Sequence, residues 1–214
     1  MTRKIDHIVW AGSDLNVLMA DFMSMTGVEA VLAGRHPTLG THNALASLSD
    51  DVYFELLAAD SHGQTSKNMG GQLAKFTSPQ IFAYMFKASD LEKLKECLAE
   101  EGIESDLVTL SRTTMTGDTL TWRLLIPKDS QFASFLPVFI DWMDTPHPST
   151  SAPKGCALIQ MRIHHPNAPR LTELLAKLDC PIEVLSADTP DFEVTLASPK
   201  GVITLHGNGQ RINA

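Results

Sequence analysis

The stretch Ile5-Asp6-His7-Ile8-Val9-Trp10-Ala11-Gly12-Ser13-Asp14-Leu15 returns as Ile81-Phe82-Ala83-Tyr84-Met85-Phe86-Lys87-Ala88-Ser89-Asp90-Leu91 and, more loosely, as Ile159-Gln160-Met161-Arg162-Ile163-His164-His165-Pro166-Asn167-Ala168. In each copy an apolar run leads through a short polar stretch into a helical pattern. Further apolar runs separated by turns follow. Such repetition decides the architecture before any single motif does. It also aligns His7 with Ala83 and Gln160, so the imidazole is more easily explained by chemistry than by the fold.

Each repeat predicts a strand, a helix and three further strands. In the first, residues 4–10 are rich in β-branched and aromatic residues, and Ser13 or Asp14 is a natural cap for an amphipathic helix that stops at Gly27. In the second, Gly117-Asp118 predicts a two-residue turn between strands. The predicted organisation is a first βαβββ module at 1–60, a connector at 61–78, a second module at 79–146, and a third, more divergent module at 155–207.

The predicted fold class is therefore α+β, with repeated βαβββ modules that form a curved-sheet barrel and carry their helices outside. Two modules side by side would enclose a cleft, and polar residues pointing into it would be candidate site residues. The connector at 61–78 is rich in Gly, Gln, Ser, Asn and Lys, so it reads as a loop or as a mobile flap over that cleft.

Composition narrows the class of protein and its partners. The 214-residue chain has a formal charge of −8 and shows no basic stripe, which argues against a nucleic-acid partner. No apolar stretch approaches the roughly 18 residues of a membrane span, and the N-terminal apolar run is too short and polar for a signal peptide. Three cysteines without a CxxC pair favour a reducing compartment, so a cytoplasmic location is expected.

Three polar residues on otherwise apolar strands are candidate metal ligands. Glu55 interrupts Val52-Tyr53-Phe54-Glu55-Leu56-Leu57, and Asp141 falls close to the same place in the second module. A carboxylate in a buried strand is costly unless it is paired, hydrogen-bonded or bound to a metal. His7, Glu55 and Asp141 together would suit a divalent ion of the Mn, Fe or Zn class. The alternative is that each carboxylate pairs with an arginine such as Arg123.

Two further clusters are candidates for catalysis and binding. The run from Gly34 to Asn43 contains His36 and His42, which can move protons near neutral pH, and Arg35 and Asn43, which can hold polar groups of a ligand. The alternative reading is a polar turn at the edge of a sheet. Later in the chain, Trp122, Arg123 and Trp142 would suit an apolar or aromatic ligand that carries an acid group, although a tryptophan alone is more often plain core.

These motifs resemble the vicinal oxygen chelate superfamily, in particular its glyoxalase-like domain group. The resemblance rests on Ile5-Asp6-His7-Ile8-Val9, Gly34-Arg35-His36-Pro37, Gly40-Thr41-His42-Asn43, Tyr53-Phe54-Glu55-Leu56-Leu57, Leu120-Thr121-Trp122-Arg123 and Pro137-Val138-Phe139-Ile140-Asp141-Trp142. It implies paired modules around a barrel-like cleft, with metal ligands from the first and last strands of each module. Carried over, the ligands are His7, Glu55 and Asp141. Ala83 departs from that pattern, and Gln160 would substitute only if the first and third modules pair.

Two functions follow as hypotheses. The first is a metal-dependent lyase, isomerase or dioxygenase acting on a small organic molecule, with Arg35 or Arg123 anchoring an acid group and His36 or His42 moving a proton. The second is a metal-free protein that binds a small molecule, or confers resistance to one, with the same cleft. A third module without an internal mate also leaves room for a homodimer.

Overall fold

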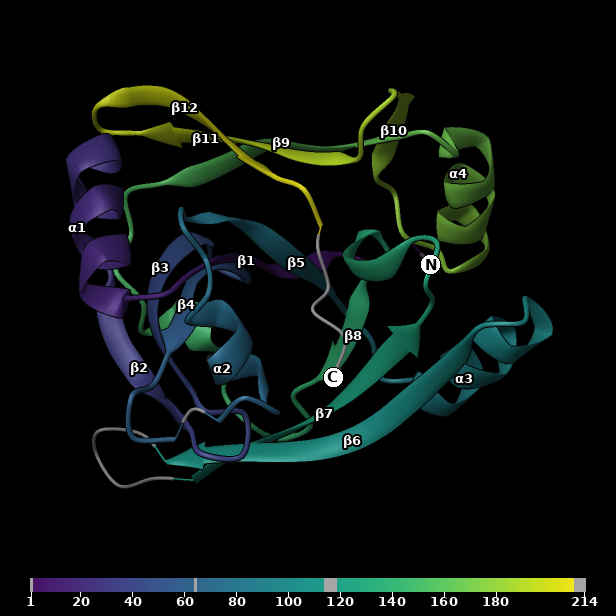
Figure 1. Ribbon diagram of the computed structural model, residues 1–214, viewed down its shortest axis with the longest axis horizontal. Coiled ribbons are helices and arrows are strands. Elements are labelled where there is room, and N and C mark those ends of the chain that lie inside the picture. The colour runs from purple at the N-terminus through teal and green to yellow at the C-terminus, as the bar shows by residue number, and fades with distance from the viewer. Residues whose placement is uncertain (1, 64, 114–118, 210–214) are drawn as a thin grey trace.

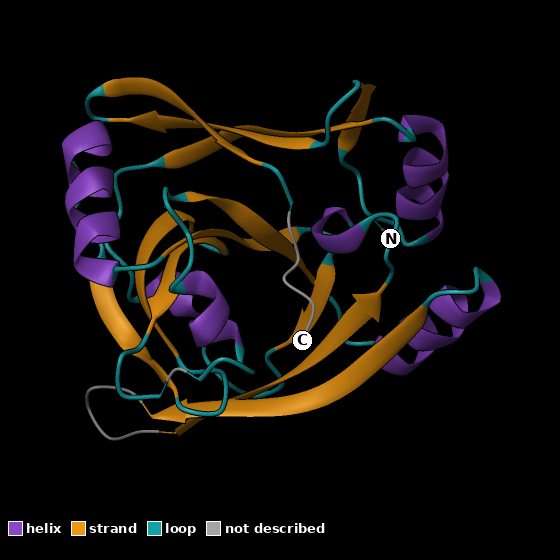
Figure 2. Cartoon of the chain, in the orientation of Figure 1, coloured by secondary structure: helices purple, strands orange, loops and turns teal. Residues whose placement is uncertain are grey.

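The chain forms two β-sheets with helices packed against them (Figure 1). The computed structural model describes residues 2–63, 65–113 and 119–209. The larger sheet has eight strands and curls into a half barrel, and the smaller one has four strands and lies across it (Figure 2). This arrangement confirms the predicted α+β class with glyoxalase-like modules.

The first module follows the predicted order. Its elements are β1 (Ile5–Gly12), α1 (Leu15–Thr26), β2 (Val31–His36), β3 (Thr41–Ser49) and β4 (Val52–Ala59). The helix begins where the Asp14 carboxylate accepts the backbone N–H groups of Asn16 and Val17. It ends at Gly27, whose φ of 76° places it in the left-handed region that favours glycine. Both caps are those that the sequence predicts.

The second module repeats the order after a connector that contains one short helix, α2 (Met69–Leu73). Its elements are β5 (Gln80–Lys87), α3 (Leu91–Glu100), β6 (Glu104–Thr113), β7 (Thr119–Lys128) and β8 (Val138–Asp141). Asp90 precedes α3 but does not cap it with its side chain, because the carboxylate forms a two-pronged ion pair with Arg3. The turn predicted at Gly117-Asp118 lies outside the described residues.

The two modules join through their first strands. The order of the large sheet is β2-β3-β4-β1-β5-β8-β7-β6, so the antiparallel pair of β1 and β5 lies at its centre. Along this seam His7 lies opposite Met85, and Val9 lies opposite Ala83. The seam therefore places the first strand of each module side by side, as the repeat predicts.

The third unit keeps the order of elements but not the order of strands. It consists of β9 (Ala157–His165), α4 (Ala168–Lys177), β10 (Glu183–Ser186), β11 (Asp191–Ser198) and β12 (Gly201–Gly207). In the first module the strand order is β2-β3-β4-β1, so the first strand, β1, lies at one end beside β4. In the third unit the order is β10-β9-β11-β12, so the first strand, β9, lies between β10 and β11. The structural equivalence of Gln160 with His7 is therefore wrong, and the third unit does not pair with the first as a barrel half.

The main core fills the space between the convex face of the large sheet and the elements outside it. Helices α1, α3 and α4 contribute leucines to this core, and the small sheet contributes Phe192 and its neighbours. The Phe192 ring lies 5.8 Å from the ring of Tyr84 on β5 and 4.4 Å from that of Phe135. The third unit thus covers the convex side, and the concave side of the half barrel faces away from it.

Replacing Gly207 by Ala is expected to loosen this attachment. A Cβ at Gly207 would come within 1.9 Å of the backbone oxygen of Ile81, and backbone cannot yield as a flexible side chain can. We expect a loss of about 3 kcal/mol in the free energy of unfolding, measured by chemical denaturation. Gly102→Ala is the control: its φ of 77° strains a side chain, but nothing lies within 4 Å, so about 1 kcal/mol is expected. Equal losses in the two variants would contradict this account of the contact.

Candidate active site on the concave face

The concave face of the large sheet carries a small group of buried polar residues. Because side chains alternate along a strand, paired residues fix which side chains share a face. Glu55 on β4 pairs with Leu45 on β3, and Asn43 lies two residues before Leu45, so Glu55 and Asn43 share this face. His7 on β1 reaches the same place. His7, Glu55 and Asn43 expose only 2%, 7% and 4% of their surface to solvent, so water is nearly excluded from them.

The three side chains form a connected arrangement. The Asn43 Nδ2 donates to Glu55 Oε1 at 2.6 Å. The other carboxylate oxygen, Oε2, lies 3.6 Å from His7 Nε2, which is beyond hydrogen-bond distance but close enough for both atoms to face one reacting group. The Asn43 Oδ1 has no hydrogen-bond partner among the described residues, although it is buried. Such an orphaned acceptor is unusual in a native protein and is a reason to look for a ligand.

Asp6 joins this group through an irregularity in the strand. Ile5 pairs with Phe86 and His7 pairs with Met85, so Asp6 is an extra residue on β1 that has no partner on β5. A bulge of this kind re-aims a side chain out of the normal alternation. As a result Asp6, which precedes His7 directly in the sequence, accepts a hydrogen bond from His7 Nδ1 at 2.6 Å. Asp6 is fully buried.

Two residues that follow β8 complete the environment of Asp6. Trp142 Nε1 donates to Asp6 Oδ2 at 3.0 Å, and His147 Nε2 lies 3.1 Å from the same oxygen. The backbone N–H of Ser149 donates to His147 Nδ1. Since Nδ1 is thereby the acceptor, Nε2 carries the proton and donates it to Asp6. We call residues 142–153 the closing segment, because it brings both side chains over the first module.

The charge state of Asp6 fixes the tautomer of His7. Burial opposes its ionisation, but the hydrogen bonds from His147 and His7 outweigh burial and hold the pKa of Asp6 well below its usual range. An ionised Asp6 can only accept, so His7 keeps a proton on Nδ1. The Nε2 atom is therefore the one that faces Glu55 and is available to take up a proton.

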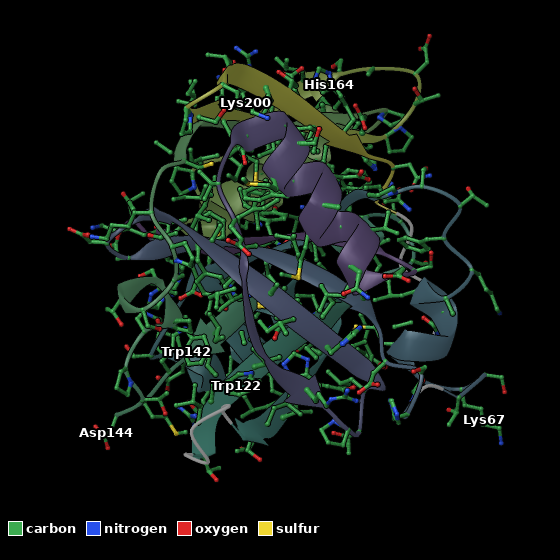
Figure 3. The ribbon with its side chains drawn as sticks, turned by 90° about the vertical axis from the view of Figure 1, so that its left-hand side faces the viewer. Lys67, Trp122, Trp142, Asp144, His164 and Lys200 are labelled. Atoms are coloured by element: carbon green, nitrogen blue, oxygen red, sulfur yellow. The ribbon has the colours of Figure 1, made fainter. Side chains whose placement is uncertain are left out.

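Aromatic and apolar side chains surround the polar group. The Tyr53 ring stacks on His7, with centroids 4.4 Å apart and an angle of 14° between the planes. The ring centroids of Trp122 and Trp142 lie 5.4 Å apart. The His36 ring meets the Trp122 ring edge-on, with centroids 6.1 Å apart, and His36 Nδ1 lies 3.1 Å from Thr41 Oγ1. Figure 3 shows both tryptophans at the opposite end of the molecule from His164 of the third unit.

Two of the predicted residues lie on the other face of β2 and β3. Arg35 pairs with His42, and His42 alternates with Asn43, so both side chains leave the concave face. The Arg35 Nη1 binds both oxygens of Asp60, at 2.7 and 2.6 Å, and burial lowers the pKa of His42. The structure therefore does not bring Arg35 or His42 together with His7 and Glu55. The signal that drew attention to this run was its density of polar residues, which does not report which face each one occupies.

Asp141 also lies on the other face, which corrects its prediction as a metal ligand beside His7. Leu124 pairs with Ile140 on the concave face, so the next pair, Arg123 and Asp141, points outward. There Arg123 binds Asp141 at 2.9 Å and Glu92 of α3 at 2.7 Å. The arginine pairing that the sequence left as an alternative is thus the observed one. Arg123 is engaged outside the concave face as well, and is not placed to hold a ligand there.

The donor set does not fit the four-ligand metal site that the family resemblance implies. The first module offers His7 Nε2 and Glu55 Oε2. At the facing positions the second module presents Ala83 and Met85 from β5, and Val138 and Ile140 from β8. Within the described residues there is no group of three or more His, Cys, Asp or Glu side chains arranged to hold a metal ion. Two donors from one module fall short of the ligand number that such ions take.

Sequence reasoning missed Asp6, Tyr53 and His147 as site residues. Asp6 was passed over because strict alternation would send it to the face opposite His7, and the bulge is visible only in the register. His147 lies in a Pro- and Ser-rich stretch that reads as a linker. One signal was available: Asp6-His7 is a charged pair inside an apolar strand, and a buried carboxylate needs partners.

Comparison with known proteins agrees with this architecture. A family model described as a glyoxalase-like domain matches residues 5–178. A hypothetical protein from Staphylococcus aureus aligns over 95% of this chain and 85% of its own, with 19% identity and a TM-score of 0.65. Methylmalonyl-CoA epimerase from Streptomyces coelicolor covers 69% of this chain over all of its own length, with 20% identity and a TM-score of 0.48. The epimerase from Mycobacterium tuberculosis covers 64% of this chain and 84% of its own, with 20% identity and a TM-score of 0.44.

The paired modules, together with the family match, define a protein of the vicinal oxygen chelate superfamily. Within it, this chain belongs to the glyoxalase-like domain family, because the family model spans most of its length. A search of curated proteins finds no match. In the described part of the chain, no helix combines the length and apolar character needed to cross a membrane.

Proposed function

We propose that this protein is a lyase or isomerase that transfers a proton on a small carbonyl compound, with His7 and Glu55 as its acid–base pair. The observation that carries the proposal is the chain of contacts Asp6–His7–Glu55 on the concave face. Asp6 directs the basic lone pair of His7 to Nε2, and Asn43 binds one oxygen of Glu55 so that Oε2 faces Nε2. Two proton acceptors on one side of a dry site suit removal of a C–H proton and its return.

Each residue of the site has its own role in the proposed proton transfer. Glu55 Oε2 takes the proton from the carbon next to the carbonyl, and the electron pair of the C–H bond moves onto the carbonyl oxygen as an enolate. His7 Nε2 returns a proton to the carbon, and exchange of either group with solvent between the two steps replaces the original proton. Asp6 stabilises the imidazolium that forms when Nε2 is protonated, because its carboxylate already binds Nδ1–H at 2.6 Å. The amide of Asn43 holds Glu55 in place. Exclusion of water by Tyr53 and the closing segment strengthens each of these charge interactions.

The test is hydrogen exchange in heavy water. A panel of small ketones, aldehydes and esters is incubated with the protein, and loss of the C–H signal beside the carbonyl is followed by proton NMR. We expect one class of compound to exchange with the wild-type chain and not with His7→Asn, which keeps a polar group of similar shape but cannot act as a base. Equal exchange by the variant would contradict the role of His7.

A second function is favoured by the apolar lining. At the positions nearest to His7 and Glu55, the second module presents Met85, Val138 and Ile140, whose side chains carry no acid or base. A protein that only binds a small molecule would need no more than such a surface with a few polar anchors. In that case a compound would bind without exchanging its protons, so the same NMR experiment separates the two functions.

A further inference from the structure

Two buried carboxylates lie close to His7 on the concave face. Asp6 and Glu55 are both buried there. The partners of Asp6 include His147, which is neutral in the observed pattern because Nδ1 accepts a hydrogen bond while Nε2 donates one. Even with His7 fully protonated, one negative charge remains uncompensated among these four groups.

Among the described side chains, Arg35, Arg123 and Lys87 are engaged with other carboxylates. Arg35 binds Asp60, and Arg123 binds Asp141 and Glu92 on the convex side. Lys87 is the last residue of β5, and its Nζ lies 3.8 Å from Asp51 Oδ2, which also forms an ion pair with Lys4. No described Lys or Arg side chain has an ion pair with Asp6 or Glu55. An anion placed beside Asp6 and Glu55 would therefore meet like charge in surroundings of low dielectric constant, where repulsion is strong.

The same place offers one buried acceptor that lacks a donor. Asn43 must turn Nδ2 towards Glu55, because a carboxylate only accepts, and this leaves Asn43 Oδ1 as a buried oxygen without a hydrogen-bond partner among the described residues. Glu55 Oε2 lies 3.6 Å from the nearest His7 nitrogen, outside hydrogen-bond distance. A ligand N–H group could donate to Asn43 Oδ1, and the positive charge of that ligand would then lie beside the Glu55 carboxylate. This observation is independent of the net charge and points to the same ligand chemistry.

The surrounding rings suit the body of such a ligand. Tyr53 stacks on His7, and Trp122 and Trp142 lie against each other at the second module's side. In Figure 3 the two tryptophans lie near one another and close to the same end of the molecule. The negative faces of aromatic rings attract cations as well as apolar groups. The charge of Asp6 and Glu55, the unpaired Oδ1 of Asn43 and the aromatic rings therefore favour the same kind of ligand.

We propose that the concave face takes a small organic cation, an ammonium or guanidinium group on an apolar body, with an N–H group of the cation donating to the Oδ1 of Asn43 and its positive charge lying beside Glu55. This inference rests on the proposed function in that it uses the same site, and it names the class of substrate. It also differs from the acid-bearing ligand that the sequence predicts, because Arg35 and Arg123, the predicted anchors of an acid group, bind carboxylates away from Glu55.

The experiment is a calorimetric titration of the full chain at neutral pH with three probes of equal shape: 1-naphthylmethylammonium, 1-naphthylmethanol and 1-naphthoate. We expect the ammonium compound to bind about tenfold more tightly than the alcohol, and the carboxylate more weakly than either. Glu55→Gln should weaken the binding of the ammonium compound about tenfold and leave the affinity for the alcohol unchanged. Glu92→Gln, which removes a carboxylate from the outer surface, is the matched control and should change neither.

Binding of the alcohol or the carboxylate as tight as that of the ammonium compound would overturn the inference. So would the absence of saturable binding of the ammonium compound below about 1 mM, or an unchanged affinity in Glu55→Gln. The two proposals fail separately. A preference for cations without proton exchange overturns the catalytic function alone, whereas exchange of an anionic substrate overturns the assigned ligand class alone.

Discussion

Glu55→Gln is expected to lower the rate of proton exchange by about 10³-fold while the chain stays folded. The substitution keeps the shape of the side chain and leaves an oxygen that can still accept from Asn43 Nδ2. It removes the carboxylate that faces His7 Nε2 across 3.6 Å, and an amide cannot take up a proton at neutral pH. The measurement is the initial rate of exchange by NMR for the compound identified with the wild-type chain, beside a thermal melt of each variant.

Asp141→Asn is the matched control for this experiment. It also exchanges a strand carboxylate for an amide, but at a residue whose partner is Arg123 on the convex face. A partly exposed ion pair is worth about 1 kcal/mol or less, so the exchange rate should stay within about twofold of wild type. A large loss of rate in Asp141→Asn together with a small one in Glu55→Gln would place the reacting groups on the other face and refute the site.

Asp6→Asn is expected to cost about 3 kcal/mol in the free energy of unfolding at neutral pH. The fully buried carboxylate accepts hydrogen bonds from His7, Trp142 and His147. The amide of an asparagine has a single oxygen to accept from these three donors. Its own N–H groups would face at least one of the donors, and that hydrogen bond would be lost. Loss of these bonds would also release the closing segment from the first module. Denaturant titrations of wild type and variant measure the difference.

The pH dependence of that difference follows from the sign of the pKa shift. The pKa of Asp6 is lower in the folded chain, so its contribution to stability is fully present above the unfolded value of about 3.9 and is lost as the pH falls towards the folded value. The gap between wild type and Asp6→Asn should therefore be constant from about pH 5 to 7 and narrow below about pH 4. A gap that widens on acidification would contradict the assigned ionisation of Asp6.

Local patterns were enough to predict the architecture of the first two modules. The repeat of Ile5–Leu15 at Ile81–Leu91 placed the two first strands as equivalents, and they pair at the centre of the sheet. Caps at Asp14 and Gly27 are short-range features that side-chain chemistry determines. The convergence of His7 and Glu55 followed from period-two alternation along β1 and β4.

What the sequence did not predict depends on register and on long-range pairing. One extra residue in β1 turned Asp6 towards His7, and one position along β8 turned Asp141 away. A shift of a single residue exchanges the faces of a strand, so pattern alone cannot assign the face of an isolated polar residue. The strand order of the third unit arises from contacts with the convex core, such as that of Phe192 with Tyr84. His147 reaches Asp6 across 141 positions, and no local rule encodes that contact.

Proton exchange by protein freed of metal tests the central claim most directly. The chain is dialysed against a chelator, its content of Mn, Fe and Zn is measured by elemental mass spectrometry, and exchange is assayed before and after dialysis and after each metal is restored. Since the second module offers no imidazole or carboxylate at the facing positions, we predict far less than one ion per chain and an unchanged rate throughout. One tightly held ion per chain, with exchange lost on its removal and regained on its return, would contradict the account.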